Sequence, residues 1–217
     1  MVGERTAVIM TWKGLPWVLG TLLLVAGGLA VFFLTMPTTA PVAHLSSDYS
    51  ADMTAGPMSA QVIVLEYADF GCIGCRVVES FLGPLRKKYQ DRVLFVYRFF
   101  PLETDRNTML AAQVAYAASL QDSFWRMHDL LYQKQAEWAQ SRNPDTLFDR
   151  YAAALGLNMD EFHLDMIADA TIAAITKQRA EGLAAGVSNT PFLVVNGVEV
   201  RPHNSEDLEA AIRAGLQ

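Results

Sequence analysis

The sequence predicts an α/β fold in which a mixed sheet is interrupted by a long helical insertion. Three patterns support this prediction: strand–helix–strand over residues 61–98, helical periodicity over about 106–186, and a hairpin over residues 191–200. A strand, a helix and a second strand in succession form a crossover unit with parallel strands. The hairpin adds antiparallel strands, so residues 59–217 are expected to form one domain around one mixed sheet.

The first half of the domain has two short apolar runs that flank a helix. Gln61–Tyr67 and Val93–Arg98 are rich in β-branched and aromatic residues, which predicts buried strands. Between them, Arg76–Tyr89 carries apolar residues at helical spacing. The second strand is expected to end at Phe100 and Pro101, because proline has no N–H to donate to a strand ladder.

The middle of the chain is predicted to be helical. Apolar residues recur with a 3.6-residue period in four segments, and a block of about 80 residues is too long to be a crossover connection alone. It is therefore expected to form an inserted helical subdomain. The four segments are Met109–Leu120, Phe124–Tyr132, Leu147–Leu155 and Ile167–Leu183.

The end of the domain predicts a hairpin followed by a helix. Pro191–Val195 and Val198–Val200 are expected to be strands, and Asn196 with Gly197 between them is a strong hairpin signal. Ser205–Leu216 has its apolar residues on one face, which is typical of an amphipathic helix that closes a domain.

An apolar segment near the N-terminus predicts a transmembrane helix over residues 15–36. No charged residue occurs over residues 14–47. A helix of 22 residues reaches about 33 Å, enough to cross a hydrocarbon core of about 30 Å. Because Arg5 and Lys13 precede the segment, the positive-inside rule places residues 1–14 in the cytoplasm and the domain on the periplasmic side.

A cleaved signal peptide is the alternative interpretation of this segment. The apolar run of a signal peptide is about 7–15 residues, shorter than the run here, and a cut after Ala40 would place Pro41 beside the cleaved bond. We therefore expect an uncleaved anchor. A linker over residues 37–58, rich in Pro, Thr, Ala and Ser, is expected to follow it.

Composition excludes several classes of protein. The chain has 217 residues with Lys+Arg 17, Asp+Glu 23 and a net charge of −6, so we expect no nucleic-acid partner, which would need clustered Lys and Arg. With 52% apolar and 18% charged residues, disorder over most of the chain is excluded. Only two cysteines occur, which rules out a disulfide-stapled scaffold and a four-thiolate zinc site.

Those two cysteines, Cys72 and Cys75, lie three residues apart where a predicted strand ends and a predicted helix begins. The free N–H groups and the dipole of a helix N-terminus stabilise an anion, so Cys72 is expected to be held as a thiolate. Cys75 lies one turn further along, where it is shielded and can attack only Cys72. This division into an attacking and a resolving thiol is what dithiol–disulfide exchange requires.

Two alternatives to redox exchange are open for this motif. A structural disulfide between Cys72 and Cys75 would close a very short loop and therefore stabilise the fold little. A zinc or copper site would need two more soft ligands, and the four histidines show no paired spacing. We therefore expect no metal and no cofactor. The histidines are His44, His128, His163 and His203.

Glu66, Thr190 and Pro191 are further candidate site residues. Glu66 lies on a strand predicted to be buried, where a carboxylate is costly unless it is paired or used, so it is expected to exchange a proton with Cys75. A solvated glutamate at a sheet edge is the alternative. Pro191 begins a predicted strand, and a cis Thr190–Pro191 bond would leave the Thr190 backbone free to bind substrate. Asp69, in the turn, is given no role.

Residues 60–217 resemble the DsbA-like, thioredoxin-fold family, in its BdbD-type branch of membrane-anchored thiol–disulfide oxidoreductases. The matching stretches occur in family order across the domain, which makes the resemblance specific. They are Val64–Cys75, Tyr97–Leu102, Phe124–Leu131 and Gly186–Gly197.

The resemblance implies a thioredoxin fold with an inserted helical subdomain. It implies that Cys72 is the attacking thiol, that Cys75 is the resolving thiol, and that Pro191 is cis. It also implies that Glu66 matches the buried acid of the family. One departure lies between the cysteines, where many oxidising members have Pro-His and this chain has Ile73-Gly74.

The sequence therefore predicts a membrane-tethered, extracytoplasmic thiol–disulfide oxidoreductase that introduces disulfides into exported proteins. The implied partners are exported proteins with cysteines, and a membrane quinone reductase of the DsbB or vitamin-K-epoxide-reductase (VKOR) type that reoxidises the pair. A disulfide reductase or isomerase with the same site is the first alternative. A non-catalytic thiol metal chaperone is the second.

Overall fold

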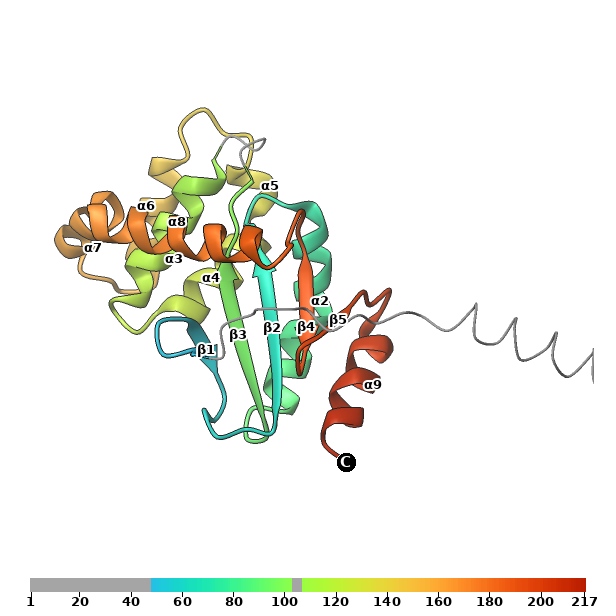
Figure 1. The fold of residues 1–217 in the computed structure, drawn as a ribbon. Coiled ribbons are helices and arrows are strands. Elements are labelled where there is room, and N and C mark those ends of the chain that lie inside the picture. Colours follow the sequence, from blue (N-terminus) through green and yellow to red (C-terminus); the bar gives the residue numbers. More distant parts are fainter. Residues whose placement is uncertain (1–47, 103–106) are drawn as a thin grey trace, which may run out of the picture. The chain divides into compact units, whose positions relative to one another are not determined.

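A mixed sheet of five strands organises the part of the chain that the computed structural model describes, residues 48–102 and 107–217 (Figure 1). Its strand order is β1-β3-β2-β4-β5. The central pair β2 and β3 is parallel, and the other three pairings are antiparallel. The strands are β1 (Met53–Ala55), β2 (Val62–Ala68), β3 (Val93–Phe99), β4 (Phe192–Val195) and β5 (Val198–Val200).

The predicted α/β class and its mixed sheet are confirmed. Helix α2 (Ile73–Lys88) joins the two parallel strands, and helix α9 (Ser205–Gly215) ends the domain. Between β4 and β5, Asn196 and Gly197 both have positive φ, 48° and 80°. Positive φ at both central residues defines a two-residue type I′ turn, which matches the twist of the strands.

The transmembrane helix predicted over residues 15–36 lies outside the described residues. Among the helices of the described ranges, none combines the length and the apolar character that crossing a bilayer requires.

The segment predicted as a linker contributes a strand to the sheet. Met53–Ala55 pairs with β3, with Met53 opposite Tyr97. The expectation of a linker is therefore wrong for residues 48–58, and residues 37–47 lie outside the described part. A three-residue edge strand carries no periodicity of its own, because its pairing is decided by the strand beside it.

Side chains alternate between the two faces of β2, as a strand geometry requires. Val62 and Val64 pack against α2 and α9 in one apolar cluster. Leu65 and Tyr67 lie in a second cluster on the opposite face. By the same alternation Glu66 belongs to the face that α2 covers.

Six helices within the described residues separate β3 from β4 in the sequence, and their apolar side chains form one core together with residues of the sheet such as Tyr97 and Phe99. Figure 1 shows them gathered at one side of the sheet, with α8 crossing the upper end of the strands. Helix α8 approaches the sheet closely, because a Cβ on its Gly182 would lie 2.8 Å from the Tyr67 ring. The helices are α3 (Thr108–Ser119), α4 (Phe124–Gln133), α5 (Gln135–Trp138), α6 (Asp145–Ala154), α7 (Met159–Ile167) and α8 (Asp169–Ala184).

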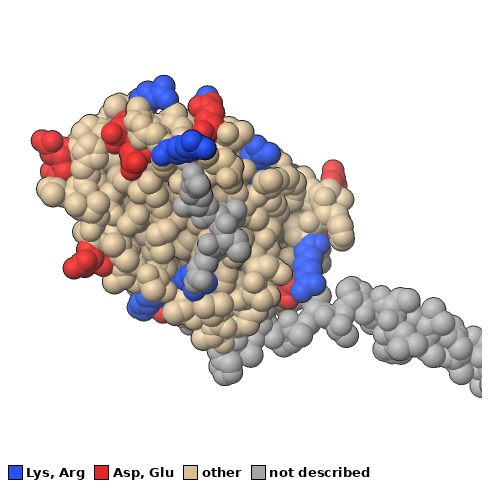
Figure 2. All heavy atoms as spheres, turned by 90° about the horizontal axis from the view of Figure 1, so that it is seen from above, with Lys and Arg blue, Asp and Glu red and all other residues tan. Residues whose placement is uncertain are grey.

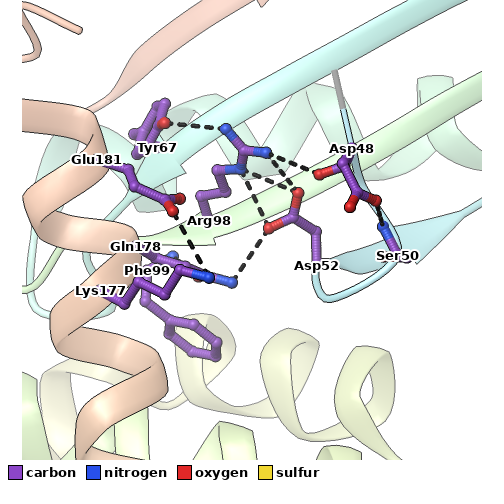
Figure 3. Close-up of polar contacts among 9 residues, drawn as sticks. All are labelled: Asp48, Ser50, Asp52, Tyr67, Arg98, Phe99, Lys177, Gln178 and Glu181. Carbon is purple, nitrogen blue, oxygen red and sulfur yellow. Dashed lines mark hydrogen bonds and ion pairs between the residues drawn. The ribbon is translucent and has the colours of Figure 1, made fainter. Parts of the chain in front are cut away.

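A buried ion pair fixes the segment before β1 to the domain (Figure 3). Arg98 of β3 donates to Asp52 through Nε and Nη2, with the shortest distance 2.7 Å, and the two side chains are 2% and 5% exposed. Arg98 also donates to the Tyr67 hydroxyl at 3.1 Å, and Gln178 of α8 donates to Asp52 at 3.1 Å. Residues from three distant parts of the chain therefore meet at the Asp52 carboxylate.

Candidate active site

Cys72 is the N-cap residue of α2, at the carboxyl end of β2. Its backbone is extended and its Sγ accepts a hydrogen bond from the Cys75 N–H at 3.4 Å. The helix therefore begins at Ile73, three residues before the start that the apolar spacing indicated. This start agrees with the helix end predicted at Cys72, and the Cys72 sulfur takes the place of the Ser, Thr, Asp or Asn that usually caps a helix.

The position of Cys72 stabilises its thiolate. The hydrogen bond from the Cys75 thiol is the largest influence and lowers the pKa of Cys72, while partial burial opposes it. Thr190 and the backbone N–H groups of Cys75 and Gly74 lower it further, so the pKa is about 5 instead of 9.0. Cys72 is thus ionised at neutral pH, as the helix-end argument predicts.

Cys75 has the opposite environment. It is fully buried one turn into α2, and burial raises the pKa of its thiol well above the ordinary value. Both cysteines are free thiols in this structure. An ionised, partly exposed sulfur thus lies next to a protonated, buried one, which are the two states that the attacking and resolving thiols need.

Glu66 lies beneath this pair on the central strand β2. It is 3% exposed and sits between Tyr97 of β3 and Leu193 of β4. The alternative of a solvated glutamate at a sheet edge is therefore wrong. Burial, and then the charge of Glu79, raises the pKa of Glu66 well above its usual value. Its Oε1 has no hydrogen-bond partner among the described residues.

Thr190 and Pro191 close the other side of Cys72. Their peptide bond is cis, as the family resemblance implies, and the Thr190 carbonyl oxygen lies 3.4 Å from Cys72 Sγ, within reach of the thiol when Cys72 is protonated. Pro191 also packs on the helix start, because a Cβ on Gly74 would lie only 3.1 Å from Pro191 Cδ and 3.6 Å from Cys72 Sγ. A side chain at position 74 would crowd Pro191, which is a steric reason for glycine at this position.

Two residues that sequence reasoning did not assign hold the cysteine loop in place. Asp69 is 1% exposed, and its two oxygens accept from the N–H groups of Gly71 at 2.7 Å and Leu102 at 2.8 Å. Gln135 of α5 donates to the carbonyls of Phe70 at 2.6 Å and Cys72 at 2.9 Å. An Asp two residues before a glycine is a recognisable turn signal, whereas nothing local marks Gln135.

Glu79, His128 and Asp129 are the one group of His, Cys, Asp and Glu side chains in the described ranges that could meet at a metal ion. Arg86 already donates to both carboxylates, at 2.9 Å to Glu79 and 3.0 Å to Asp129. A divalent cation would therefore have to displace or repel a guanidinium, and the donor set does not favour a metal there.

Comparison with known proteins agrees with the fold. A family model described as Thioredoxin matches residues 48–214. Among solved structures, Wolbachia pipientis α-DsbA1 is 20% identical with a TM-score of 0.67, covering 75% of this chain and 89% of its own. Oxidised BdbD from Bacillus subtilis is 20% identical with a TM-score of 0.68, covering 78% and 95%. A thioredoxin-like oxidoreductase from Silicibacter pomeroyi is 24% identical with a TM-score of 0.67, covering 80% and 98%.

Curated relatives of higher identity are much longer proteins. Na(+)/H(+) antiporter NhaA 3 of Salinispora tropica is 38% identical over 172 residues, which are 78% of this chain and 25% of the antiporter. Na(+)/H(+) antiporter NhaA 1 of Mycolicibacterium vanbaalenii is 31% identical over 170 residues, 76% and 26% of the two lengths. This chain thus spans about a quarter of the curated relatives that it matches.

A low-pKa thiol at a helix N-terminus and a buried second thiol, on a sheet of this topology, define the class of thiol–disulfide oxidoreductases. Within that class the chain belongs to the thioredoxin family, with a DsbA-like fold.

Proposed function

We propose that this chain is a membrane-tethered, extracytoplasmic protein thiol oxidase, which introduces disulfides into exported proteins through Cys72 and Cys75. One observation carries the proposal: Cys72 has a pKa of about 5 and lies beside a buried Cys75 whose pKa is raised. A disulfide oxidises other thiols strongly when its reduced form is stabilised, and a stable thiolate provides that stabilisation.

The reaction runs in two exchange steps. A substrate thiolate attacks Cys72 Sγ of the Cys72–Cys75 disulfide, so a mixed disulfide forms and Cys75 leaves and takes up a proton. A second substrate thiolate then attacks the substrate sulfur of the mixed disulfide and releases Cys72 as a thiolate. The substrate loses two electrons and gains a disulfide, and the enzyme is left as Cys72 thiolate and Cys75 thiol.

The surface around Cys72 supports a polypeptide substrate. A cleft of about 410 Å³ borders the sulfur, lined by Cys72, Ile73, Leu102 and Ala136 among others. Ile73 and Val77 of α2 are 68% and 55% exposed. Figure 2 looks down on the end of the molecule where α2 begins, and on the surface drawn in colour there most Lys, Arg, Asp and Glu side chains lie toward the margin. An apolar surface of this kind can bind unfolded chains of different sequence, because it does not require particular charges in the substrate.

Reoxidation requires an acceptor of two electrons. We assign this role to a membrane quinone reductase of the DsbB or VKOR type, whose own disulfide Cys72 would attack. An anchor over residues 15–36 would hold enzyme and reductase at the same membrane. The basic residues before this segment and the uncharged run within it support the anchor.

The orientation of the chain gives the first prediction. A phosphatase reporter that folds only outside the cytoplasm, fused after Gln217, is expected to be active and to sediment with membranes. Arg5→Glu and Lys13→Glu together should lower that activity, because they remove the positive flank. Lys87→Glu with Lys88→Glu is the control, since it changes the same charge far from the segment. A reporter active only in the cytoplasm, or a mature N-terminus near Pro41, would contradict the tethered topology.

The reduction potential tests the direction of the reaction. It should lie between that of thioredoxin, about −270 mV, and that of DsbA, about −120 mV, and in the upper half of this interval. The low pKa of Cys72 raises it, while Ile73 and Gly74 contribute no charge or side-chain donor. Equilibration in glutathione buffers with mass-spectrometric counting of free thiols measures it. A value at or below that of thioredoxin favours a reductase, and stoichiometric Cu(I) or Zn(II) retention without exchange favours a metal chaperone.

A further inference from the structure

His128 belongs to a motif to which the exchange reaction assigns no role. It is fully buried on α4. Its Nδ1 lies 3.0 Å from Asp129 Oδ1, but its Nε2 has no partner among the described residues. Buried polar atoms are nearly always paired, so this nitrogen requires an explanation. Five aromatic rings enclose it, with centroids 5.0 to 5.7 Å from its own: Phe70, Tyr97, Phe124, Trp125 and Tyr132.

The unpaired nitrogen faces an unpaired carboxylate oxygen. Glu79 Oε2 lies 3.8 Å from His128 Nε2 and has no hydrogen-bond partner in the described part of the chain. The other oxygen of Glu79 accepts from Arg86 at 2.9 Å, which holds the carboxylate in place. A separation of 3.8 Å is too long for a hydrogen bond, but a small rotation or one bridging water would close it.

Glu79 is also coupled to the acid beneath the cysteines. Its charge is the second cause, after burial, of the raised pKa of Glu66. Glu66 in turn helps to raise the pKa of Cys75. The buried Oε1 of Glu66 is a third unpaired polar atom in this region. Cys75, Glu66, Glu79 and His128 thus form a series of proton-exchanging groups that lead away from the reacting sulfurs.

The series ends at solvent. A cleft of about 610 Å³ lies between α2 and α4, and its lining includes Glu79, Arg86 and Asp129. Asp129 is 42% exposed and contacts the Nδ1 side of His128. Burial raises the pKa of Asp129, but the hydrogen bond to His128 and the charge of Arg86 outweigh it, so Asp129 is held as a carboxylate.

We propose that Glu79 and His128 carry protons between Glu66 and this cleft, and so set the rate at which Cys75 gains or loses its proton. The proposal rests on thiol–disulfide exchange at Cys72 and Cys75, and it holds for either direction of that exchange. Both act through Glu66, whose pKa the charge of Glu79 raises.

The proton balance explains why such a route is needed. When Cys75 resolves a mixed disulfide, its S–H gives its proton to the Glu66 carboxylate and its sulfur bonds to Cys72 Sγ. The bond between Cys72 and the partner sulfur breaks, and the partner leaves as a thiolate. Glu66 can accept that proton only after it has released its own, and burial favours its protonated form by raising its pKa well above the usual value. That earlier proton leaves through Glu79 and His128 to water.

Three other groups packed in this region, Tyr97, Tyr132 and Arg86, do not exchange protons near pH 7. Burial raises the pKa of Tyr97 and of Tyr132 well above the usual value, so neither exchanges protons near pH 7. Arg86 is a fixed cation. The groups that face Glu66 or Glu79 are Cys72, Cys75 and Arg86 from the start and middle of α2, Tyr97 from β3, and His128, Asp129 and Tyr132 from α4.

The test separates the two steps of one reaction. The reduced protein is mixed with oxidised glutathione, quenched with acid at set times and analysed by mass spectrometry. In the first step the Cys72 thiolate attacks glutathione disulfide, and Cys75 takes no part. In the second step Cys75 loses its proton and displaces glutathione. The first step is therefore an internal control for the second, and its occurrence in the wild type tests the exchange activity itself.

Glu79→Gln keeps the shape of the side chain and the acceptor for Arg86, but it cannot carry a proton. The second step should slow about tenfold at pH 7, less than the about 10²–10⁴ that a direct general base contributes, while the first step stays unchanged. Imidazole, which fits the cleft, should restore the rate in proportion to its concentration. Glu66→Gln should slow the same step more. Glu209→Gln is the matched control, because Glu209 also accepts from a cation of α2, Lys88 at 2.6 Å, but lies on α9.

An electrostatic role without proton transfer predicts the opposite sign. Removing the Glu79 charge would then lower the pKa of Glu66, ease its ionisation and speed the second step at pH 7. An unchanged or faster second step in Glu79→Gln therefore overturns the proposal, as does a slower step that imidazole does not restore. If Glu79→Gln does not fold, the same assay on His128→Gln decides, with the same expected slowing and the same contrary outcomes.

Discussion

Cys72 of the reduced protein is expected to react with iodoacetamide at pH 6 more than about tenfold faster than Cys75. With a pKa of about 5, Cys72 is mostly thiolate at that pH, whereas the raised pKa of Cys75 leaves almost none. A low-pKa thiolate is intrinsically a weaker nucleophile, with a Brønsted coefficient of about 0.4–0.5, so part of the advantage is lost. The complete burial of Cys75 adds to the difference.

The pH dependence of the alkylation rate tests whether the pKa of Cys72 is lowered. The alkylation rate of Cys72 should rise with pH, reach half its plateau near pH 5 and then stay level. Cys75→Ala should move this midpoint upward, because it removes the hydrogen bond from the Cys75 thiol, the largest influence that lowers the pKa of Cys72. Mass spectrometry of peptides after timed alkylation measures both sites. A midpoint near the ordinary thiol value, or equal rates at the two cysteines, would contradict the helix-end arrangement.

Arg98→Met is expected to lower the free energy of unfolding by about 3–5 kcal/mol, the usual cost of leaving one member of a buried ion pair without its partner. Asp52 is 5% exposed and would lose the Nε and Nη2 donors of Arg98, so it would be left either charged and unpaired or protonated at a further raised pKa. Urea denaturation followed by circular dichroism measures the change. The variant also removes the hydrogen bond to Tyr67.

Two comparisons identify the cause of that loss. Arg98→Met combined with Asp52→Leu should recover a large part of it, because no unpaired charge then remains. Lys88→Met removes a cation from the Glu209 ion pair, in which Lys88 is 57% exposed, and should change stability little. If Arg98→Met is as stable as the wild type, the network in Figure 3 does not hold residues 48–52 to the domain.

The features that sequence predicted are those with a local cause. Strands β2 and β3 and the hairpin around Asn196 and Gly197 follow from runs and turn residues a few positions long. Cys72 and Cys75 follow from their spacing and from the end of the strand before them. Glu66 is placed by alternation along β2, which puts it on the face under α2.

The features that sequence missed depend on contacts between distant elements. Gln135 holds the Cys72 loop only because α5 packs beside it. Glu79 and His128 lie on helices separated by β3 and α3, so no spacing rule brings Nε2 and Oε2 together. Strand β1 exists because β3 offers it an edge, and its own three residues carry no signal.

The Arg98–Asp52 pair also limits how far the domain could lie from an anchor at residues 15–36. If residues 15–36 anchor the chain, eleven residues separate the anchor from Asp48, and even fully extended they span only about 36–40 Å. Releasing residues 48–61 would extend that limit to about 83–90 Å. The volume that Cys72 can sweep would grow several-fold, and its effective concentration at a membrane partner would fall accordingly. With such an anchor, the buried ion pair on the sheet would therefore control how often the enzyme meets a membrane partner.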